Sequence, residues 1–110
     1  MAYMFSDCSS LTDINLSNII TINTTNINEM FVGCSKLKKL NLSSFVTNNV
    51  TTLAGMFYDC TSLEELDLSN FNTENVEITG CMFYNCTSLK KINLSSFNTN
   101  KVKIMDVMFL

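Results

Sequence analysis

The sequence contains no histidine, arginine, proline, tryptophan or glutamine, and the first two absences each argue against a class of function. Without histidine, the commonest general base and metal ligand is unavailable. Without arginine, and with a net charge of −3, the chain has no basic stripe of the kind that nucleic-acid binding requires. We therefore expect no catalytic residues, no metal site, no cofactor and no nucleic-acid partner.

Long hydrophobic runs are also missing. The longest apolar stretches are a few residues, whereas a membrane-spanning helix needs about 20, so this segment predicts no membrane insertion. The first ten residues, MAYMFSDCSS, already belong to a repeat and predict no signal peptide. Apolar residues nevertheless make up 46% of the chain, which is enough for a folded core.

A Met-Phe dipeptide recurs with a constant 26-residue step, at 4–5, 30–31, 56–57, 82–83 and 108–109. A fixed period indicates one supersecondary unit stacked on itself, so the sequence predicts a solenoid rather than a globule around one centre. We predict a single solenoid domain over residues 1–110. Its repeats are 4–29, 30–55, 56–81 and 82–107, with the start of a fifth at 108–110.

The pattern of apolar residues in each unit predicts one short strand. Leucine or isoleucine occupies positions 8, 11 and 13 of every unit, counted from the Met, and the step from 11 to 13 is the alternation of a strand with one buried face. We expect parallel strands near 13–16, 39–42, 65–68 and 91–94. The rest of each unit should be loops, with a short helical or 3₁₀ turn over Met-Phe-x-x-Cys-x-x-Leu.

Two positions downstream of the strands bear on the core. Position 16, which is isoleucine in the first unit and phenylalanine in the next three, predicts a stacked interior column. Position 24 is less regular, and in the third unit it is Thr79. We expect the neighbouring Ile78 to point inward in place of Thr79.

A cysteine column keeps the 26-residue step at Cys8, Cys34, Cys60 and Cys86. Stacked cysteines would lie about 5 Å apart, within disulfide range, but parallel Cβ vectors suit bridging poorly. A zinc site would need a CxxC-type pair or histidines. We favour buried free thiols over a disulfide, and a disulfide over a metal. The fifth cysteine, Cys81, is out of register and is the candidate exposed, reactive thiol.

The outward-facing strand positions carry charges of alternating sign, in two rows, Asp13/Lys39/Glu65/Lys91 and Thr12/Lys38/Glu64/Lys90. Their main interpretation is an internally compensated ladder, with about 0.2–1 kcal/mol per exposed pair. The alternative is a binding strip, beside which position 12 adds polar side chains. The candidate partner-contact residues are Lys39, Asn41, Glu65, Asp67, Lys91 and Asn93.

The run LxxLxLSxF over residues 63–71 looks like a leucine-rich repeat. The longer pattern MFxxCxSLxxLxLSxFxT resembles the BspA-like leucine-rich repeats and the related 26-residue repeat of bacterial surface proteins, including mycoplasmal lipoproteins. In the second unit it rests on Met30, Phe31, Cys34, Leu37, Leu40, Leu42, Ser43, Phe45 and Thr47. The resemblance implies a right-handed solenoid with a strand-lined concave face, usually displayed on a cell surface for adhesion or protein binding. It implies no catalytic residues.

Together these features predict a non-enzymatic module that binds a protein, such as a host surface or matrix protein, through its strand face. The alternative is a structural protein that associates end to end, or an intracellular scaffold. Neither end of the sequence has a polar cap, which predicts a piece of a longer array or ends closed by pairing. The expected location is the cell surface or secretion for a longer protein, and the cytoplasm for a complete chain, where free cysteines suit a reducing compartment.

Overall fold

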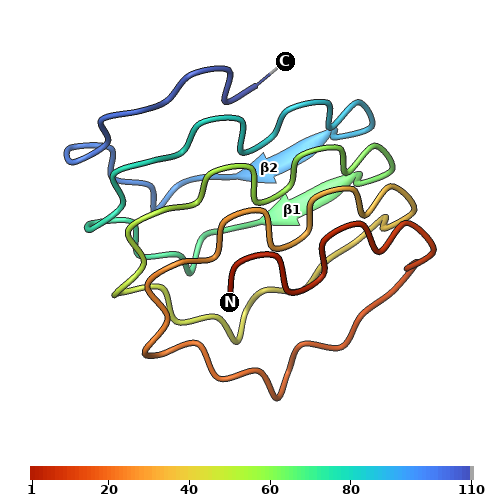
Figure 1. The fold of residues 1–110 in the computed structure, drawn as a ribbon, viewed down its shortest axis with the longest axis horizontal. Helices are drawn as coiled ribbons and strands as arrows, with labels where there is room; N and C mark the ends of the chain where they lie inside the picture. The colour runs from red at the N-terminus through yellow and green to blue at the C-terminus, as the bar shows by residue number, and fades with distance from the viewer. Residues whose placement is uncertain (110) are drawn as a thin grey trace.

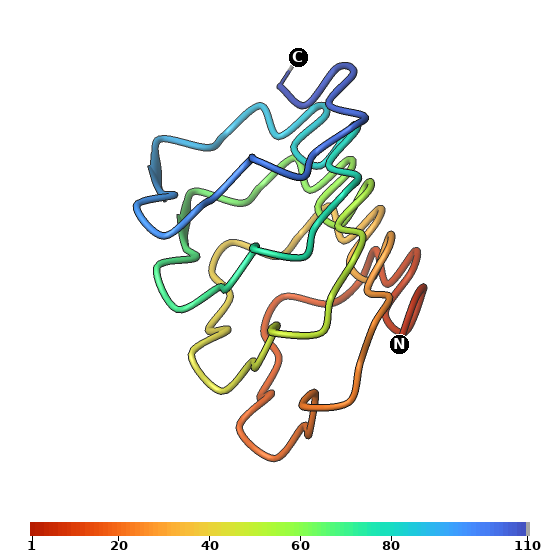
Figure 2. The same ribbon diagram turned by 90° about the vertical axis from the view of Figure 1, so that its left-hand side faces the viewer.

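The computed structural model describes residues 1–109, over which the chain winds in coils stacked one on the next (Figures 1 and 2). Within these residues the regular elements are two strands, β1 at Glu65–Asp67 and β2 at Lys91–Asn93, and no helix is formed. The strands pair in parallel, with Glu65 opposite Lys91 and Asp67 opposite Asn93. Each partner lies one full repeat later in the chain, so one sequence repeat makes one coil.

Backbone hydrogen bonds at the Met-Phe edge join each coil to the next. Around the third Met-Phe, the N–H groups of Gly55, Phe57 and Asp59 donate to carbonyls of the next coil, each at 3.0 Å. The residues between them donate three residues back instead, as Tyr58 does to the Gly55 carbonyl at 3.0 Å. The same alternation begins at Tyr3 in the first coil. Its result is a chain of tight turns, each hydrogen-bonded to the turn above it.

The helical turn expected at this edge is therefore not formed. The residue before the methionine of each Met-Phe dipeptide has a left-handed φ, and so does the residue three after that methionine. The values run from 49° at Glu29 to 72° at Gly33. A residue with left-handed φ interrupts a right-handed turn, so a continuous helix cannot form here. The left-handed residues are Tyr3, Asp7, Glu29, Gly33, Gly55, Asp59, Cys81, Asn85 and Val107.

The two strands lie inside the ranges 65–68 and 91–94 that the leucine spacing predicts. In the predicted range 39–42 the backbone makes a single bridge, between Lys39 and Glu65, and no strand is formed. The predicted strand at 13–16 is not formed, which corrects that prediction. The Asp13 carboxylate accepts the N–H of Ile14 at 2.8 Å, and such a local bond competes with a strand ladder for the same donor.

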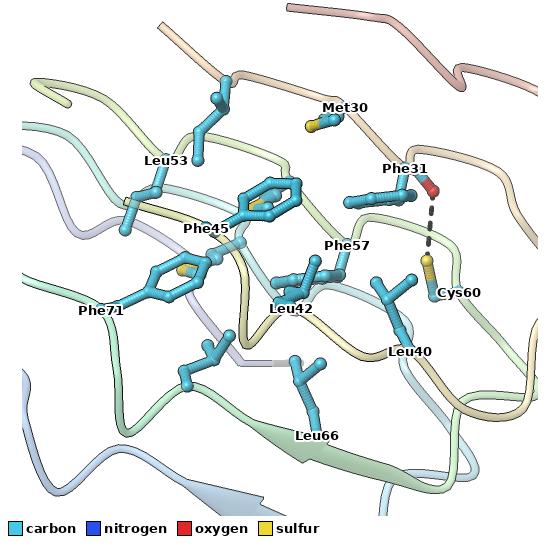
Figure 3. Close-up of a cluster of buried hydrophobic side chains, with 14 of the residues drawn as sticks. Met30, Phe31, Leu40, Leu42, Phe45, Leu53, Phe57, Cys60, Leu66 and Phe71 are labelled. Carbon is cyan, nitrogen blue, oxygen red and sulfur yellow. Dashed lines mark hydrogen bonds between the residues drawn. The ribbon is translucent and has the colours of Figure 1, made fainter. Parts of the chain in front are cut away.

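The core fills the inside of the coils with columns of side chains (Figure 3). The phenylalanines of the Met-Phe motif stack, with ring centroids 5.9 Å apart for Phe31 and Phe57 and 5.6 Å for Phe57 and Phe83. A second column at position 16 pairs Phe45 with Phe71 at 6.3 Å. Stacked columns of this kind bury each ring between two neighbours, which no single coil achieves alone.

The threonines at position 18 of the first three units, Thr21, Thr47 and Thr73, have a role that the sequence did not reveal. The buried hydroxyl of Thr47 donates to the carbonyl of Asn72 at 3.0 Å and accepts the N–H of the same residue at 2.8 Å. Thr73 repeats both bonds with Asn98, at 3.1 and 2.7 Å. Each such threonine thus fastens two coils through a side chain where the backbones do not bond directly.

Thr79 points inward and is 1% exposed, whereas Ile78 is half-buried and forms backbone bridges to Thr52 and Ile104. The expectation that Ile78 replaces Thr79 in the core is therefore wrong. The period of the coil fixes which position faces inward, even where the residue is polar. Within residues 1–109 the Thr79 hydroxyl is the one buried side-chain polar atom without a hydrogen-bond partner.

Replacing Thr79 by valine, which has nearly the same shape, should raise the free energy of unfolding by about 1 kcal/mol because it removes an unpaired buried hydroxyl. The matched change Thr73→Val should lower it by about 1–2 kcal/mol, since it breaks two hydrogen bonds between coils. Urea unfolding of the three proteins measures both effects. A destabilised Thr79→Val protein would mean that the hydroxyl is hydrogen-bonded in solution.

Candidate interaction surface

A groove of about 850 Å³ lies over the strand face and is lined by residues from four coils. The six predicted partner-contact residues all line it, and they are exposed: Lys39, Asn41, Glu65, Asp67, Lys91 and Asn93. Asp13 lines the same groove and was missing from that set. It could have been identified from the sequence, because it occupies the same repeat position as Lys39 and Glu65.

The charges at the groove are aligned by the backbone but do not form ion pairs with one another. Backbone pairing places Lys39 opposite Glu65 and Glu65 opposite Lys91. Over residues 1–109, however, the ion pairs are Glu64–Lys90 at 3.9 Å and Glu77–Lys103 at 2.9 Å. Of the predicted ladder, therefore, one ion pair forms, between Glu64 and Lys90, and the side chains in the row of Glu65 face solvent.

The residue at position 12 of each unit forms a side-chain turn just after the strand position. The Oδ1 atom of Asn41 accepts the N–H of Ser43 at 3.0 Å, and Asp67 accepts that of Ser69 at 2.9 Å. Asn15 and Asn93 make the same bond in their own coils. These Asx turns use one oxygen per residue, so the remaining polar atoms are available to a partner.

The carboxylate of Asp67 is held in its charged form by this turn. Hydrogen bonds from the Ser69 backbone N–H and from its hydroxyl lower the pKa of Asp67 below 3.8. The groove therefore keeps a fixed negative charge beside β1 at any physiological pH.

A second hollow, of about 400 Å³, lies over a row of asparagines whose side-chain amides are already hydrogen-bonded within the chain. The amide of Asn49 donates to the carbonyl of Ile22, and that of Asn75 donates to Asn48, each at 2.9 Å. Lys101 continues the row by donating to the Asn75 side chain at 2.9 Å. The hydrogen bonds of this row join coils to one another.

All five cysteines are free thiols, and the regular column is part of the core. The thiol of Cys60 donates to the carbonyl of Phe31 at 3.1 Å (Figure 3), and Cys34 and Cys86 make the equivalent bonds to Phe5 and Phe57. Residues 1–109 contain no group of three or more His, Cys, Asp or Glu side chains placed to hold a metal ion.

Burial lowers the reactivity of three of the four column cysteines, Cys34, Cys60 and Cys86. It raises the pKa of both Cys34 and Cys86 to about 11, and that of Cys60 further in the same direction. The thiolate is the reactive form of cysteine, so these side chains are poor nucleophiles at neutral pH.

Cys81 is half-buried, as are Cys8 and Cys86, so it is not uniquely accessible. It occupies the left-handed position before Met82, with φ 56°, and its sulfur lies 3.9 Å from the carbonyl oxygen of Asp106. It is the candidate reactive thiol by its place outside the column rather than by full exposure.

A family model described as "Mycoplasma protein of unknown function, DUF285" matches residues 1–110, which is the full length of the sequence. The chain belongs to the DUF285 family. No curated protein and no solved structure matches it. Among the described residues of this DUF285 chain, no helix is long and apolar enough to cross a membrane.

Thiol labelling of the DUF285 chain should separate the two classes of cysteine. At neutral pH, iodoacetamide should modify Cys8 and Cys81 at least about tenfold faster than the buried Cys34 and Cys60. Peptide mass spectrometry over a time course measures the order, and labelling in urea provides the control in which all five react alike. Early modification of Cys60 would contradict the buried column.

Stability should fall between about pH 9 and pH 11. Below pH 9 the thiols of Cys34 and Cys86 are protonated in both states, but above it they ionise first in the unfolded chain, because folding raises their pKa from 9.0 to about 11. The loss should be on the order of 2 kcal/mol per buried thiol. Urea unfolding across this range should therefore show a shallower pH slope for Cys34→Ala than for wild type. An exposed control, Ser9→Ala, should keep the wild-type slope.

Proposed function

We propose that this DUF285 chain is a non-enzymatic module that binds protein partners through the strand-face groove. The observation that carries the proposal is the row of exposed charges without ion pairs, Lys39, Glu65 and Lys91, which lines a groove of about 850 Å³. Exposed charges that are fixed in register and unpaired within the chain offer a partner directional electrostatic contacts.

We further propose that the fold is a leucine-rich-repeat solenoid of the BspA-like kind. The support is one coil per sequence repeat, parallel pairing of residues one repeat apart, and columns of Leu, Phe and Cys at the positions that carry the resemblance. Repeat proteins of this architecture present extended surfaces to their partners.

Display on a cell surface and adhesion to a host surface or matrix protein are part of the same proposal. They rest on the resemblance to bacterial surface repeats. The groove residues add a chemical expectation, since a partner should present both acidic and basic side chains to a row of alternating sign.

A second candidate, end-to-end assembly, is favoured by the last described coil. Ile104 and Val107 are each 45% exposed and Phe109 is 55% exposed, although the equivalent residues of the coil just before it, Ile78, Cys81 and Phe83, are better covered. A further coil of the same kind, in the same chain or in another, would bury these side chains.

Binding to purified matrix proteins tests the groove directly. The variant Lys39→Glu/Lys91→Glu should lose at least about tenfold in affinity for any matrix protein that wild type binds, because it reverses two groove charges. The variant Lys36→Glu/Lys38→Glu changes the net charge equally at exposed lysines that do not line the groove, and it should bind as wild type does.

Surface plasmon resonance against fibronectin, laminin and collagen provides the measurement. Equal losses in both variants would show a nonspecific charge effect and remove support for the groove. Unchanged binding in the groove variant would place the contact elsewhere on the chain.

A further inference from the structure

The charges along the groove have a symmetry that concerns the choice of partner. One residue per coil forms the row Asp13, Lys39, Glu65 and Lys91, so that the sign alternates from negative to positive. Read in the opposite direction, the row has the opposite sign at every place. Neighbouring coils on a strand ladder lie about 4.8 Å apart, so the pattern has a defined spacing.

We propose that the groove binds the same groove of a second copy of this chain. A two-fold axis parallel to the strands, passing between the coils of Lys39 and Glu65, turns the row onto itself in reverse. Asp13 then faces the partner's Lys91, and Lys39 faces the partner's Glu65, with both contacts made twice by symmetry. This inference rests on the proposed function, because it names the partner of the same surface.

The neighbouring row is complementary under the same operation. Asn41 comes to face the partner's Asp67. The Oδ1 atom of Asn41 already accepts the N–H of Ser43, which leaves its amide N–H groups to donate. The Asp67 carboxylate accepts hydrogen bonds from Ser69 and, having four lone-pair sites, can accept a further one. Asn41 of one copy therefore supplies a hydrogen-bond donor, and Asp67 of the other copy supplies an acceptor.

The same pattern rejects other registers. A shift by one coil would place Glu65 against the partner's Glu65 and Lys39 against the partner's Lys91. An axis along the stack of coils would instead place Glu65 against the partner's Asp67. Like charges oppose both arrangements, so alternation of sign selects one register out of several.

The charge row also gives a direct test by complementary substitutions. Lys39→Glu and Glu65→Lys each place two pairs of like charges in the self-dimer, so each variant alone should associate at least about tenfold more weakly than wild type. An equimolar mixture of the two restores opposite charges at all four contacts and should form a heterodimer. The double variant Lys39→Glu/Glu65→Lys should form a homodimer again.

Sedimentation equilibrium at low ionic strength measures these states, and added salt should weaken the association. The control pair is Lys36→Glu and Glu74→Lys, which reverses exposed charges outside the groove and should leave every dimer intact. Recovery of association in the mixture also shows that both single variants are folded.

Wild-type chain that stays monomeric at every concentration, or single variants that dimerise as wild type does, would overturn the proposal. So would a dimer lost in Val107→Lys and kept in the groove variants, since that result indicates end-to-end association. A monomer that still binds a matrix protein through Lys39 and Lys91 would overturn self-recognition and leave the proposed function standing. Groove-dependent dimers without matrix binding would support self-recognition alone.

Discussion

Backbone hydrogen bonds between coils hold this chain at one offset. Along the Met-Phe edge, alternate N–H groups meet carbonyls of the next coil, and on the strand face residues one repeat apart pair in parallel. Every column in the molecule, whether of phenylalanine, threonine, cysteine or charge, exists because this offset is kept. A slip of one residue would turn each buried side chain of a strand to the opposite face, so the repeat in the sequence and the register in the structure support each other.

Polar groups inside such a stack have to be satisfied from the neighbouring coil. Thr47 and Thr73 achieve this with paired bonds to one residue above, and the Cys60 thiol reaches the Phe31 carbonyl. The asparagine row through Asn49 and Asn75 does the same at the outer edge. These side chains add to the backbone bonds of the Met-Phe edge, which helps to explain how a chain with two short strands keeps its coils together.

The groove is a consequence of the same offset. Side chains outside the core repeat once per coil, so a substitution pattern along the sequence becomes a pattern along a line in space. Alternation of lysine and acid at position 10 gives this line a direction and a register. A surface built this way can distinguish partners by charge order, without a deep cavity or a reactive side chain.

The sequence alone indicated the 26-residue period, the ranges in which β1 and β2 form, and the row of exposed side chains along the strand face, because side-chain alternation is a local property. It did not determine the path of the Met-Phe edge, where apolar spacing typical of a helix belongs to a series of left-handed turns that includes Glu29, Cys81 and Val107. Nor did it show that Asp13 captures a strand donor or that Thr79 stays in the core. At each of these places, local preference competes with bonds and packing between residues one repeat apart. Only the tertiary structure brings such residues together, and so only the tertiary structure decides that competition.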